Sequence, residues 1–363
     1  MGFKCGLVGL PNVGKSTIFN ALTALQVPAS NYPFCTIDPN IGIVPLKDER
    51  LETIARVIGS AKITPTTLEF IDIAGLVKGA SKGEGLGNQF LSHIQGVDAI
   101  AHVVRCFEDA NVAHVSAQLD PIADVEVVMT ELIMKDLEIV ERKLARLSTA
   151  MKSGDPKIKE QWEIFSEIKQ GLSQGIPLKR MQISSEAREA LTELNLLTLK
   201  PAIFIANVGE ENFKDDRYAK QLQAYAEQHN EPCVVVYGKI QEEIAQLDPE
   251  SQPEFLREWG LDELSLHQVV RAGYQVLNLI TFFTANKNEA HAWTIPRGTL
   301  VHKAAGKIHS DFERGFIKAE VIKYQDLVLH GSEAKLKELG LVAIHGKDYV
   351  VEDGDLIFYR FHN

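Results

Sequence analysis

Five short runs of apolar residues predict the strands of one sheet. They occupy residues 5–8, 68–73, 99–104, 202–206 and 233–237. Near-continuous apolar strands that alternate with helices are typical of a parallel sheet covered by helices on both faces. The pattern therefore predicts an α/β domain with a mostly parallel sheet, built from residues 1–125 and 195–280.

Between the third and fourth runs, apolar residues recur at helical spacing. The positions that alternate four and three residues apart, a heptad seam, are Ile133, Leu137, Val140, Leu144, Leu147 and Met151. Residues 153–156 break this helix, and a second amphipathic stretch runs from about 157 to 172. Residues 126–194 are therefore predicted to form an inserted antiparallel helical hairpin. It is either a packing arm for its own domain or a contact arm for a large partner.

After residue 281 the pattern changes to short strand-like pieces around one helix. The pieces are residues 293–295, 316–321, 349–351 and 356–361, and the helix is 332–339. Asp353-Gly354 is typical of a hairpin turn between the last two strands. Residues 281–363 are therefore predicted to form a small α+β module.

The turn after the first apolar run has the sequence of a phosphate-binding loop. Residues 9–16 read G-L-P-N-V-G-K-S, a complete G-x-x-x-x-G-K-S motif between a strand and a helix. The backbone N–H groups of such a loop surround phosphate oxygens at the N-terminal end of the helix. Lys15 is expected to reach the β- and γ-phosphates as a catalytic residue, and the Ser16 hydroxyl to bind Mg²⁺. The predicted nucleotide-binding residues of this loop are Asn12, Val13, Gly14, Lys15, Ser16 and Thr17.

Two further segments predict that the bound nucleotide works a switch. Asp72 ends the second apolar run and begins D-I-A-G, in which the carboxylate can hold the Mg²⁺ hydration shell and the Gly75 N–H can contact the γ-phosphate. Thr36, in the preceding loop, is expected to close onto Mg²⁺ when the γ-phosphate is present. The predicted metal ligands are thus Ser16, Thr36 and Asp72. The glycine-rich residues 75–87 suit a switch loop, with a plain flexible loop as the alternative.

The residues after the fourth run argue against guanine specificity. Guanine-specific proteins carry N-K-x-D there, whereas this chain reads Asn207-Val208-Gly209-Glu210. Val208 removes the lysine, and Glu210 displaces the carboxylate by one methylene, which costs a bidentate pair on the order of 1–3 kcal/mol. Adenine can offer its amino group to Asn207 or to backbone carbonyls, and Gly238 is expected to contact the base through its backbone. ATP is the predicted nucleotide; the alternative is a GTPase in signalling or assembly, in which Glu210 still reads guanine.

Composition sets only broad limits. The 363 residues are 45% hydrophobic and 24% charged, an ordinary globular composition that suggests two or three domains. The net charge of −11 argues against indiscriminate coating of nucleic acid but permits a local basic face. Four scattered cysteines without a C-x-x-C pair indicate reduced thiols. Neither a signal peptide nor a membrane span is recognisable, so we expect a cytoplasmic protein, and a monomer.

Together these segments resemble a known family. The set G-L-P-N-V-G-K-S-T, N-Y-P-F-C-T-I-D-P, D-I-A-G-L-V-K-G-A and N-V-G-E is similar to the Obg-like ATPases of the YchF type, and the resemblance covers nearly the whole chain. It implies a P-loop NTPase fold of the G-domain kind, a C-terminal β-grasp module of the TGS type, hydrolysis of ATP in preference to GTP, and association with ribosomes. The chain departs from the family at Tyr237-Gly238-Lys239, where relatives more often have S-A-K.

The residue after Gly75 predicts slow hydrolysis. Many switch NTPases place a glutamine there to orient the attacking water, but this chain has Leu76, which cannot hydrogen-bond to water. His114 is the candidate catalytic residue in its place, with an ordinary surface or core histidine as the alternative. Asn12 is a candidate for coordinating K⁺ beside the phosphates.

The C-terminal module carries a basic stretch between residues 287 and 309. Its members are Lys287, Arg297, Lys303 and Lys307, with His291, His302 and His309, against the single acid Glu289. Trp293 lies among them as a stacking surface for a base. The stretch is either a solvated face or an RNA contact. With the helical hairpin it is the predicted route to ribosomes and RNA.

Overall fold

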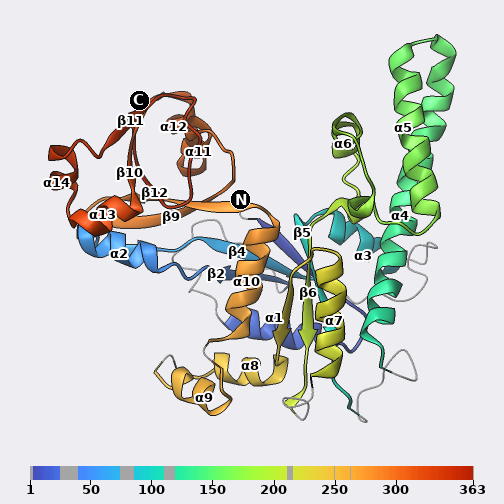
Figure 1. Ribbon diagram of the computed structural model, residues 1–363, viewed down its shortest axis with the longest axis horizontal. Coiled ribbons are helices and arrows are strands. Elements are labelled where there is room, and N and C mark those ends of the chain that lie inside the picture. Colours follow the sequence, from blue (N-terminus) through green and yellow to red (C-terminus); the bar gives the residue numbers. More distant parts are fainter. Residues whose placement is uncertain are drawn as a thin grey trace.

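The computed structural model describes residues 3–24, 40–73, 86–109, 119–210, 216–248, 250–261 and 263–362. These ranges form three parts: a central sheet with its helices, a helical arm that projects from it, and a second sheet near the C-terminus (Figure 1).

The central sheet confirms the predicted mostly parallel α/β fold. Its strands are β1 (Lys4–Val8), β2 (Ile41–Pro45), β4 (Thr67–Asp72), β5 (Ala99–Arg105), β6 (Ala202–Asn207) and β7 (Cys233–Val236), in the order β2-β4-β1-β5-β6-β7. Only β2 runs antiparallel to its neighbour, β4.

Helices cover both faces of this sheet, which explains its continuous apolar strands. On β6, Ile203 and Ile205 lie in the apolar cluster that includes α10 (Ser265–Val276), whereas Phe204 and Ala206 lie in the cluster that includes α7 (Arg217–Gln228). The other helices of this part are α1 (Lys15–Ala24), α3 (Leu86–Gln95), α8 (Gly238–Ala245) and α9 (Gln252–Glu258).

The arm is a pair of antiparallel helices, α4 (Pro121–Ala150) and α5 (Pro156–Ser173), joined at η3 (Met151–Ser153). The heptad seam supplies much of its core, because Ile133, Val140, Leu144 and Leu147 pack with Phe165, Ile168 and Leu172. Met151 is the exception: it follows the end of α4 and is 37% exposed. The chain returns to the sheet through η4 (Leu178–Arg180), α6 (Ser185–Thr192) and η5 (Leu197–Leu199).

The second sheet has the order β11-β10-β12-β8-β9-β3. Its C-terminal strands are β8 (Leu279–Ala285), β9 (Glu289–Pro296), β10 (Phe316–Lys323), β11 (Ala343–His345) and β12 (Asp355–Phe361). The described part of this module contains four helices where the sequence predicted one: α11 (Val301–Ile308), α12 (Ser310–Arg314), α13 (Tyr324–His330) and α14 (Glu333–Glu338). The first three are five to eight residues long, too short for a clear helical period.

The predicted hairpin at Asp353-Gly354 is wrong. Residues 349–351 form no regular strand but an isolated bridge between Val350 and Leu300. The Gly354 N–H donates to the Thr281 carbonyl at 2.8 Å, so the turn lies against β8. β12 then pairs with β10 and β8 instead of folding back on the segment before it.

Residues 49–64 leave the central sheet and pack with the second one (Figure 1). They form α2 (Glu49–Ile58) and β3 (Lys62–Thr64), between β2 and β4 in the chain. Leu51, Ile54 and Ala55 of α2 enter the core of the C-terminal module, and β3 pairs in parallel with β9. The division of the chain at residues 125, 194 and 280 remains a prediction, to which the structure adds that this early segment packs with the last part.

Among the helices described, none has both the length and the apolar character that crossing a membrane requires.

Candidate nucleotide site

The loop between β1 and α1 is shaped by two residues in the left-handed region. Asn12 has φ 62° and Gly14 has φ 90°. A Cβ at Gly14 would lie 2.1 Å from Nδ2 of Asn207, and one at Gly9 would lie 2.4 Å from the Val103 carbonyl oxygen. The motif glycines are therefore required by close contacts as well as by φ. The loop opens directly onto the N-terminal end of α1, where backbone N–H groups favour an anion.

Lys15 lies back over the loop that precedes it. Its side chain is buried, and Nζ donates to the carbonyl oxygens of Gly9 and Leu10, each at 3.3 Å. Burial lowers the pKa of Lys15, and the nearby charge of Asp72 opposes that shift. An anionic phosphate beside Lys15 would further favour the charged ammonium.

Asp72, at the end of β4, has an unused buried oxygen. Its Oδ1 has no hydrogen-bond partner among the residues described. Desolvation raises the pKa of this carboxyl, and the charge of Lys15 opposes the shift. A buried carboxylate oxygen needs a donor, and a water bound to Mg²⁺ is a suitable one. The Asp72 carboxylate and the exposed Ser16 hydroxyl are oxygen ligands of the kind that Mg²⁺ prefers.

Asn207 joins three segments of the site. Its buried side chain donates from Nδ2 to the Val13 carbonyl at 2.9 Å, and Oδ1 accepts from the Gly238 N–H at 3.2 Å. The phosphate loop, the end of β6 and the start of α8 are thus fixed relative to one another. A Cβ at Gly238 would lie 2.7 Å from Oδ1, so this arrangement also requires glycine at position 238.

The two residues that replace the guanine-reading lysine and aspartate differ in exposure. Val208 is 2% exposed and packs with Cys106, Ala219 and Leu222. Glu210 is half-exposed and lies 3.6 Å from Nζ of Lys239, at the start of α8. The buried Val208 side chain therefore cannot lie over a base as the aliphatic part of a lysine would. The carboxylate of Glu210 already has the ammonium group of Lys239 beside it.

The structure brings the phosphate loop, Asp72, Asn207 and Gly238 to the carboxyl ends of β1, β4, β6 and β7. This edge is where ligands bind in open α/β sheets. The predictions for Thr36, Gly75, Leu76 and His114, and for most of the glycine-rich loop, concern residues outside the described part of the chain.

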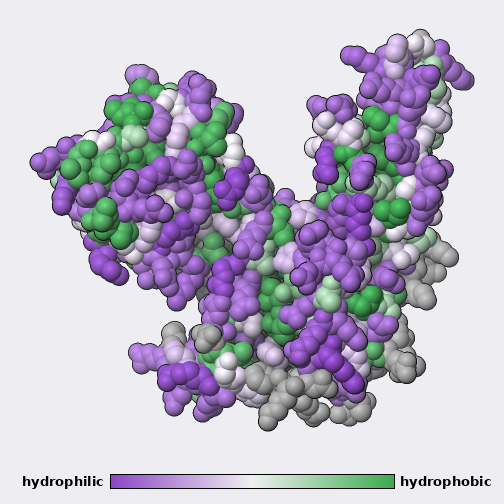
Figure 2. All heavy atoms as spheres, in the orientation of Figure 1, coloured by the Kyte–Doolittle hydropathy of each residue, from purple (hydrophilic) through white to green (hydrophobic). Residues whose placement is uncertain are grey.

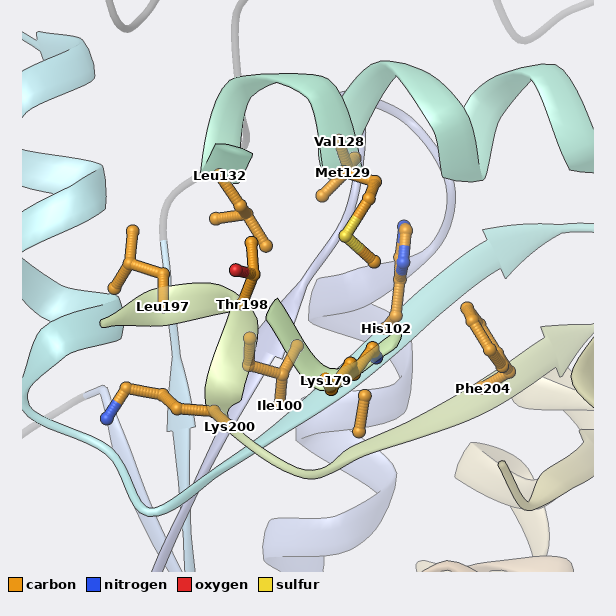
Figure 3. Close-up of a pocket in the computed structure, with 11 residues that line it drawn as sticks. Ile100, His102, Val128, Met129, Leu132, Lys179, Leu197, Thr198, Lys200 and Phe204 are labelled. Carbon is orange, nitrogen blue, oxygen red and sulfur yellow. The ribbon is translucent and has the colours of Figure 1, made fainter. Parts of the chain in front are cut away.

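His102, on β5, lies away from this edge and faces a small cavity against α4 (Figure 3). Desolvation, with smaller effects of Lys179 and Lys15, lowers its pKa to about 3. The cavity has a volume of about 20 Å³, enough for roughly one water. Its lining includes Ile100, Val128, Met129, Leu132, Lys179 and Phe204. This cavity is therefore too small for a substrate.

Sequence reasoning missed Arg105, a buried cation at the carboxyl end of β5. It is paired in register with Asn207, and its guanidinium donates to the carbonyls of Phe107 at 3.0 Å and Asp109 at 3.2 Å. It thereby orders the segment that leaves the strand. A charged residue at the end of an otherwise apolar run was the available signal.

Comparisons with known proteins agree with this geometry. Residues 4–141 match the family MMR_HSR1, described as a 50S ribosome-binding GTPase. Residues 279–362 match YchF-GTPase_C, described as a protein of unknown function (DUF933).

Full-length relatives are similar along the entire chain. The chain is 48% identical over 362 residues to the ribosome-binding ATPase YchF of Escherichia coli O157:H7, and 47% identical over 365 residues to that of Bacillus subtilis (strain 168), with 100% of each chain covered. The solved structure of the Schizosaccharomyces pombe YchF GTPase superposes with a TM-score of 0.89 at 35% identity, covering 99% of this chain and 98% of that one. A GTP-binding protein from Pyrococcus horikoshii OT3 shares the fold, with a TM-score of 0.61 at 17% identity and coverage of 99% and 100%.

Proposed function

This chain belongs to the YchF family, and from that membership and the geometry of the site we propose that it is a ribosome-associated ATPase that works as a nucleotide switch in the cytoplasm. The observation that carries the proposal is the phosphate loop, with Lys15 and Asp72 beside it and Asn207 fixing it to the base side of the site.

The residues around the loop can bind and neutralise a triphosphate. The loop N–H groups and Lys15 would hold the phosphate oxygens, while Ser16 and Asp72 would hold Mg²⁺. The ion supplies charge neutralisation at the β- and γ-oxygens. Asn12, exposed at the rim of the loop, is the residue we propose for K⁺.

We further propose that γ-phosphate is sensed by Thr36 and Gly75, and that Leu76 makes hydrolysis slow. His114 is the residue proposed to orient the attacking water. On this proposal, His114→Ala lowers kcat and leaves the ATP affinity unchanged; equal turnover in the variant would eliminate His114.

The base side of the site supports ATP over GTP. Val208 is buried in an apolar cluster, and Glu210 is longer than aspartate and lies beside Lys239. Neither reproduces the lysine stem or the aspartate of a guanine site. The specific alternative is a regulatory GTPase, which the description of the matched N-terminal family favours.

Affinities for ATP and GTP, measured side by side with Mg²⁺, separate the two functions. We expect the wild type to bind ATP more tightly, and the double variant Val208→Lys, Glu210→Asp to gain at least about tenfold for GTP relative to ATP, the effect of one recovered charged hydrogen bond. Gln223→Lys with Glu227→Asp, on exposed positions of α7, is the matched control. GTP binding tenfold tighter than ATP binding in the wild type would overturn the ATP proposal.

For the ribosome, we propose contacts through the helical arm and the C-terminal module of a monomer. Within the module, the structure reduces the charge of the basic stretch. Burial lowers the pKa of His291 to about 4, Trp293 has one face stacked on His291 at 3.8 Å, and Lys303 pairs with Glu313 at 2.6 Å. Because these contacts reduce the charge and the free ring surface of the module, we propose that the arm makes the larger part of the ribosome contact.

A further inference from the structure

Two antiparallel strands connect the nucleotide site with the C-terminal module. They are β2 and β4, here called the ribbon, which pair over the whole length of β2. Backbone hydrogen bonds extend the pairing at both ends, from the Asp72 N–H to the Asn40 carbonyl and from the Leu46 N–H to the Thr66 carbonyl, each at 2.9 Å. The ribbon lies at the edge of the central sheet and runs toward α2 and the module (Figure 1).

The nucleotide end of the ribbon contains a residue of the proposed Mg²⁺ site. Asp72 is the last residue of β4, and its buried Oδ1 has no hydrogen-bond partner among the residues described. A water bound to Mg²⁺ would supply that partner. The nearby Lys15 donates to the carbonyls of Gly9 and Leu10, and a phosphate would compete with them for its ammonium group. Loading with Mg²⁺ and ATP therefore changes the contacts at this end of β4.

Four hydroxyl groups, here called the hydroxyl junction, join the other end of the ribbon to α10 and to the module. They belong to Thr66, Tyr274 of α10, Thr281 of β8 and Thr294 of β9. Thr66 hydrogen-bonds to Thr294, and Oη of Tyr274 lies 2.7 Å from the Thr281 hydroxyl and 2.9 Å from that of Thr294. Because a hydroxyl rotates and can both donate and accept, these bonds can rearrange without leaving a buried polar group unpaired.

α10 is the fixed side of this junction. Leu266, Val269 and Val270 are buried in the core of the central part. The chain then passes from α10 into β8 after two residues. Tyr274 therefore provides a hydroxyl group on a firmly packed helix, past which the ribbon and β9 can shift.

The module must follow any shift of the ribbon, because residues 49–64 are part of its structure. Leu51 and Ile54 are buried in the module core, and β3 pairs with β9. Nη1 of Arg50 lies 2.7 Å from Oδ2 of Asp353. A displacement at the far end of the ribbon is thus carried into the module and not absorbed by a loose connection.

The packing at the junction leaves room for such a displacement. An open cleft of about 270 Å³ lies between the end of the ribbon, α2, β3 and the start of α10. Its lining includes Pro45, Leu46, Leu51, Ile63, Pro65 and His267. In Figure 2 the module stands out from the central part as a separate lobe. The contacts between the two parts are therefore interrupted where the ribbon enters the module.

We propose that the ribbon and the hydroxyl junction transmit the loading of the nucleotide site to the C-terminal module. On this inference the contacts of the module with the ribbon and α10 differ between the nucleotide-free protein and the protein that has bound Mg²⁺ and ATP. The inference rests on the proposed binding of ATP, and it gives the proposed switch an output on a surface distant from the nucleotide.

The test compares amide hydrogen exchange of full-length proteins without nucleotide and with Mg²⁺ and a non-hydrolysable ATP analogue. Mass spectrometry follows the segments 60–66 and 286–296, which contain β3 and β9, and calorimetric titration shows that each protein binds the analogue. The variants are the double variant Thr66→Val, Thr294→Val, the single variant Tyr274→Phe, and the conservative double variant Thr66→Ser, Thr294→Ser. Thr198→Val, which removes a buried hydroxyl at the base of the arm, is the matched control.

In the wild type we expect the analogue to slow exchange in both segments by about threefold or more. This response should be lost in the double valine variant and in Tyr274→Phe, although both still bind the analogue. The serine variant, which keeps the hydroxyls, and Thr198→Val should respond as the wild type does.

The outcomes separate this inference from the proposed function. Wild type that does not bind the analogue contradicts the proposed function itself. Wild type that binds it without a change of exchange in the two segments overturns the inference alone. A full response in the double valine variant and in Tyr274→Phe overturns the role of the hydroxyl junction, and so does an equal loss of response in the serine and valine variants.

Discussion

At the scale of single residues, the side chain of Asn207 fixes the position of the phosphate loop relative to the start of α8. We predict that Asn207→Ala leaves the Val13 carbonyl and the Gly238 N–H unpaired in a buried place, at a cost of about 1–3 kcal/mol each. ATP affinity should fall about tenfold or more, measured by calorimetric titration.

Asn195→Ala provides the comparison. This substitution also removes two hydrogen bonds, to the Gln95 carbonyl and from Nζ of Lys200, but it lies before the start of β6, at the opposite ends of the strands from the loop. An ATP affinity equal to that of the wild type in Asn207→Ala would show that the bridge is not needed for binding.

His102 should make the fold sensitive to acid. Its pKa is about 3 in the folded state and 6.5 when solvated, so the unfolded chain binds the extra proton between these values. The contribution of neutral, buried His102 to the free energy of unfolding is fully present above pH 6.5. It is lost as the pH falls toward 3, at about 1.4 kcal/mol per pH unit.

We predict that His102→Phe flattens the fall in unfolding free energy between pH 7 and pH 5 by about 2 kcal/mol, in urea titrations at each pH. The exposed His93→Phe should follow the wild-type curve. Equal pH dependence of the unfolding free energy in His102→Phe and the wild type would contradict the lowered pKa of His102.

Sequence could predict the residues of the site by type but not the hydrogen bonds that hold them. The G-x-x-x-x-G-K-S motif and Asp72 follow from local spacing and lie at one sheet edge. Asn207 was predicted to face the base, yet its amide is used by Val13 and Gly238, which lie 194 and 31 positions away in the chain. No local pattern encodes such a contact.

At the scale of elements, the C-terminal end of α3 is held by the return segment of the arm. Nζ of Lys200 donates to the carbonyls of Val97 at 2.6 Å and Gln95 at 3.2 Å, and to Oδ1 of Asn195 at 3.0 Å. α3 directly follows the glycine-rich loop in the chain. This cluster therefore links that helix to the base of the arm.

We predict that Lys200→Met speeds amide hydrogen exchange at the end of α3 and lowers the unfolding free energy by about 1–3 kcal/mol, because two partly buried carbonyls lose a charged donor. Exchange is followed by mass spectrometry. Lys169→Met, which removes an exposed pair with Glu141, should change stability by less than about 1 kcal/mol. Equal effects of the two substitutions would contradict the prediction.

Long elements were predictable from sequence and short ones were not. The arm follows from a heptad seam that continues over several turns of α4. The five-residue α12 and the isolated bridge at Val350 are set by packing in the second sheet, which overrides local preference.

At the scale of the whole molecule, the C-terminal module contains a piece of the N-terminal half. Arg50 of α2 reaches across to Asp353, with Nη1 to Oδ2 at 2.7 Å, and Leu51 and Ile54 are buried in the module core. The sequence of residues 46–66 does not indicate that this segment packs with the C-terminal module, because α2 has an ordinary amphipathic pattern that would fit either sheet.

We predict that residues 279–362 are unstable alone and that fusing residues 46–66 to them through a flexible linker raises the unfolding free energy by about 3–6 kcal/mol. The gain in unfolding free energy comes from burying the side chains of Leu51 and Ile54, which contribute about 1.5–3 kcal/mol each. Urea unfolding followed by circular dichroism measures it. The same fusion with Leu51→Asp and Ile54→Asp should give no gain, and equal stability with and without the segment would contradict the prediction.

Because α2 and β3 pack with the C-terminal module, their contacts can form only late in the synthesis of the chain. Thr64 and Glu289, which hydrogen-bond across β3 and β9, are separated by 225 positions in the chain. At about 5–20 residues per second, a nascent chain carries α2 for roughly 10–45 s before its partners exist. During that interval Leu51 and Ile54 are uncovered, so the growing chain is open to aggregation and to chaperones until its last strands leave the exit tunnel.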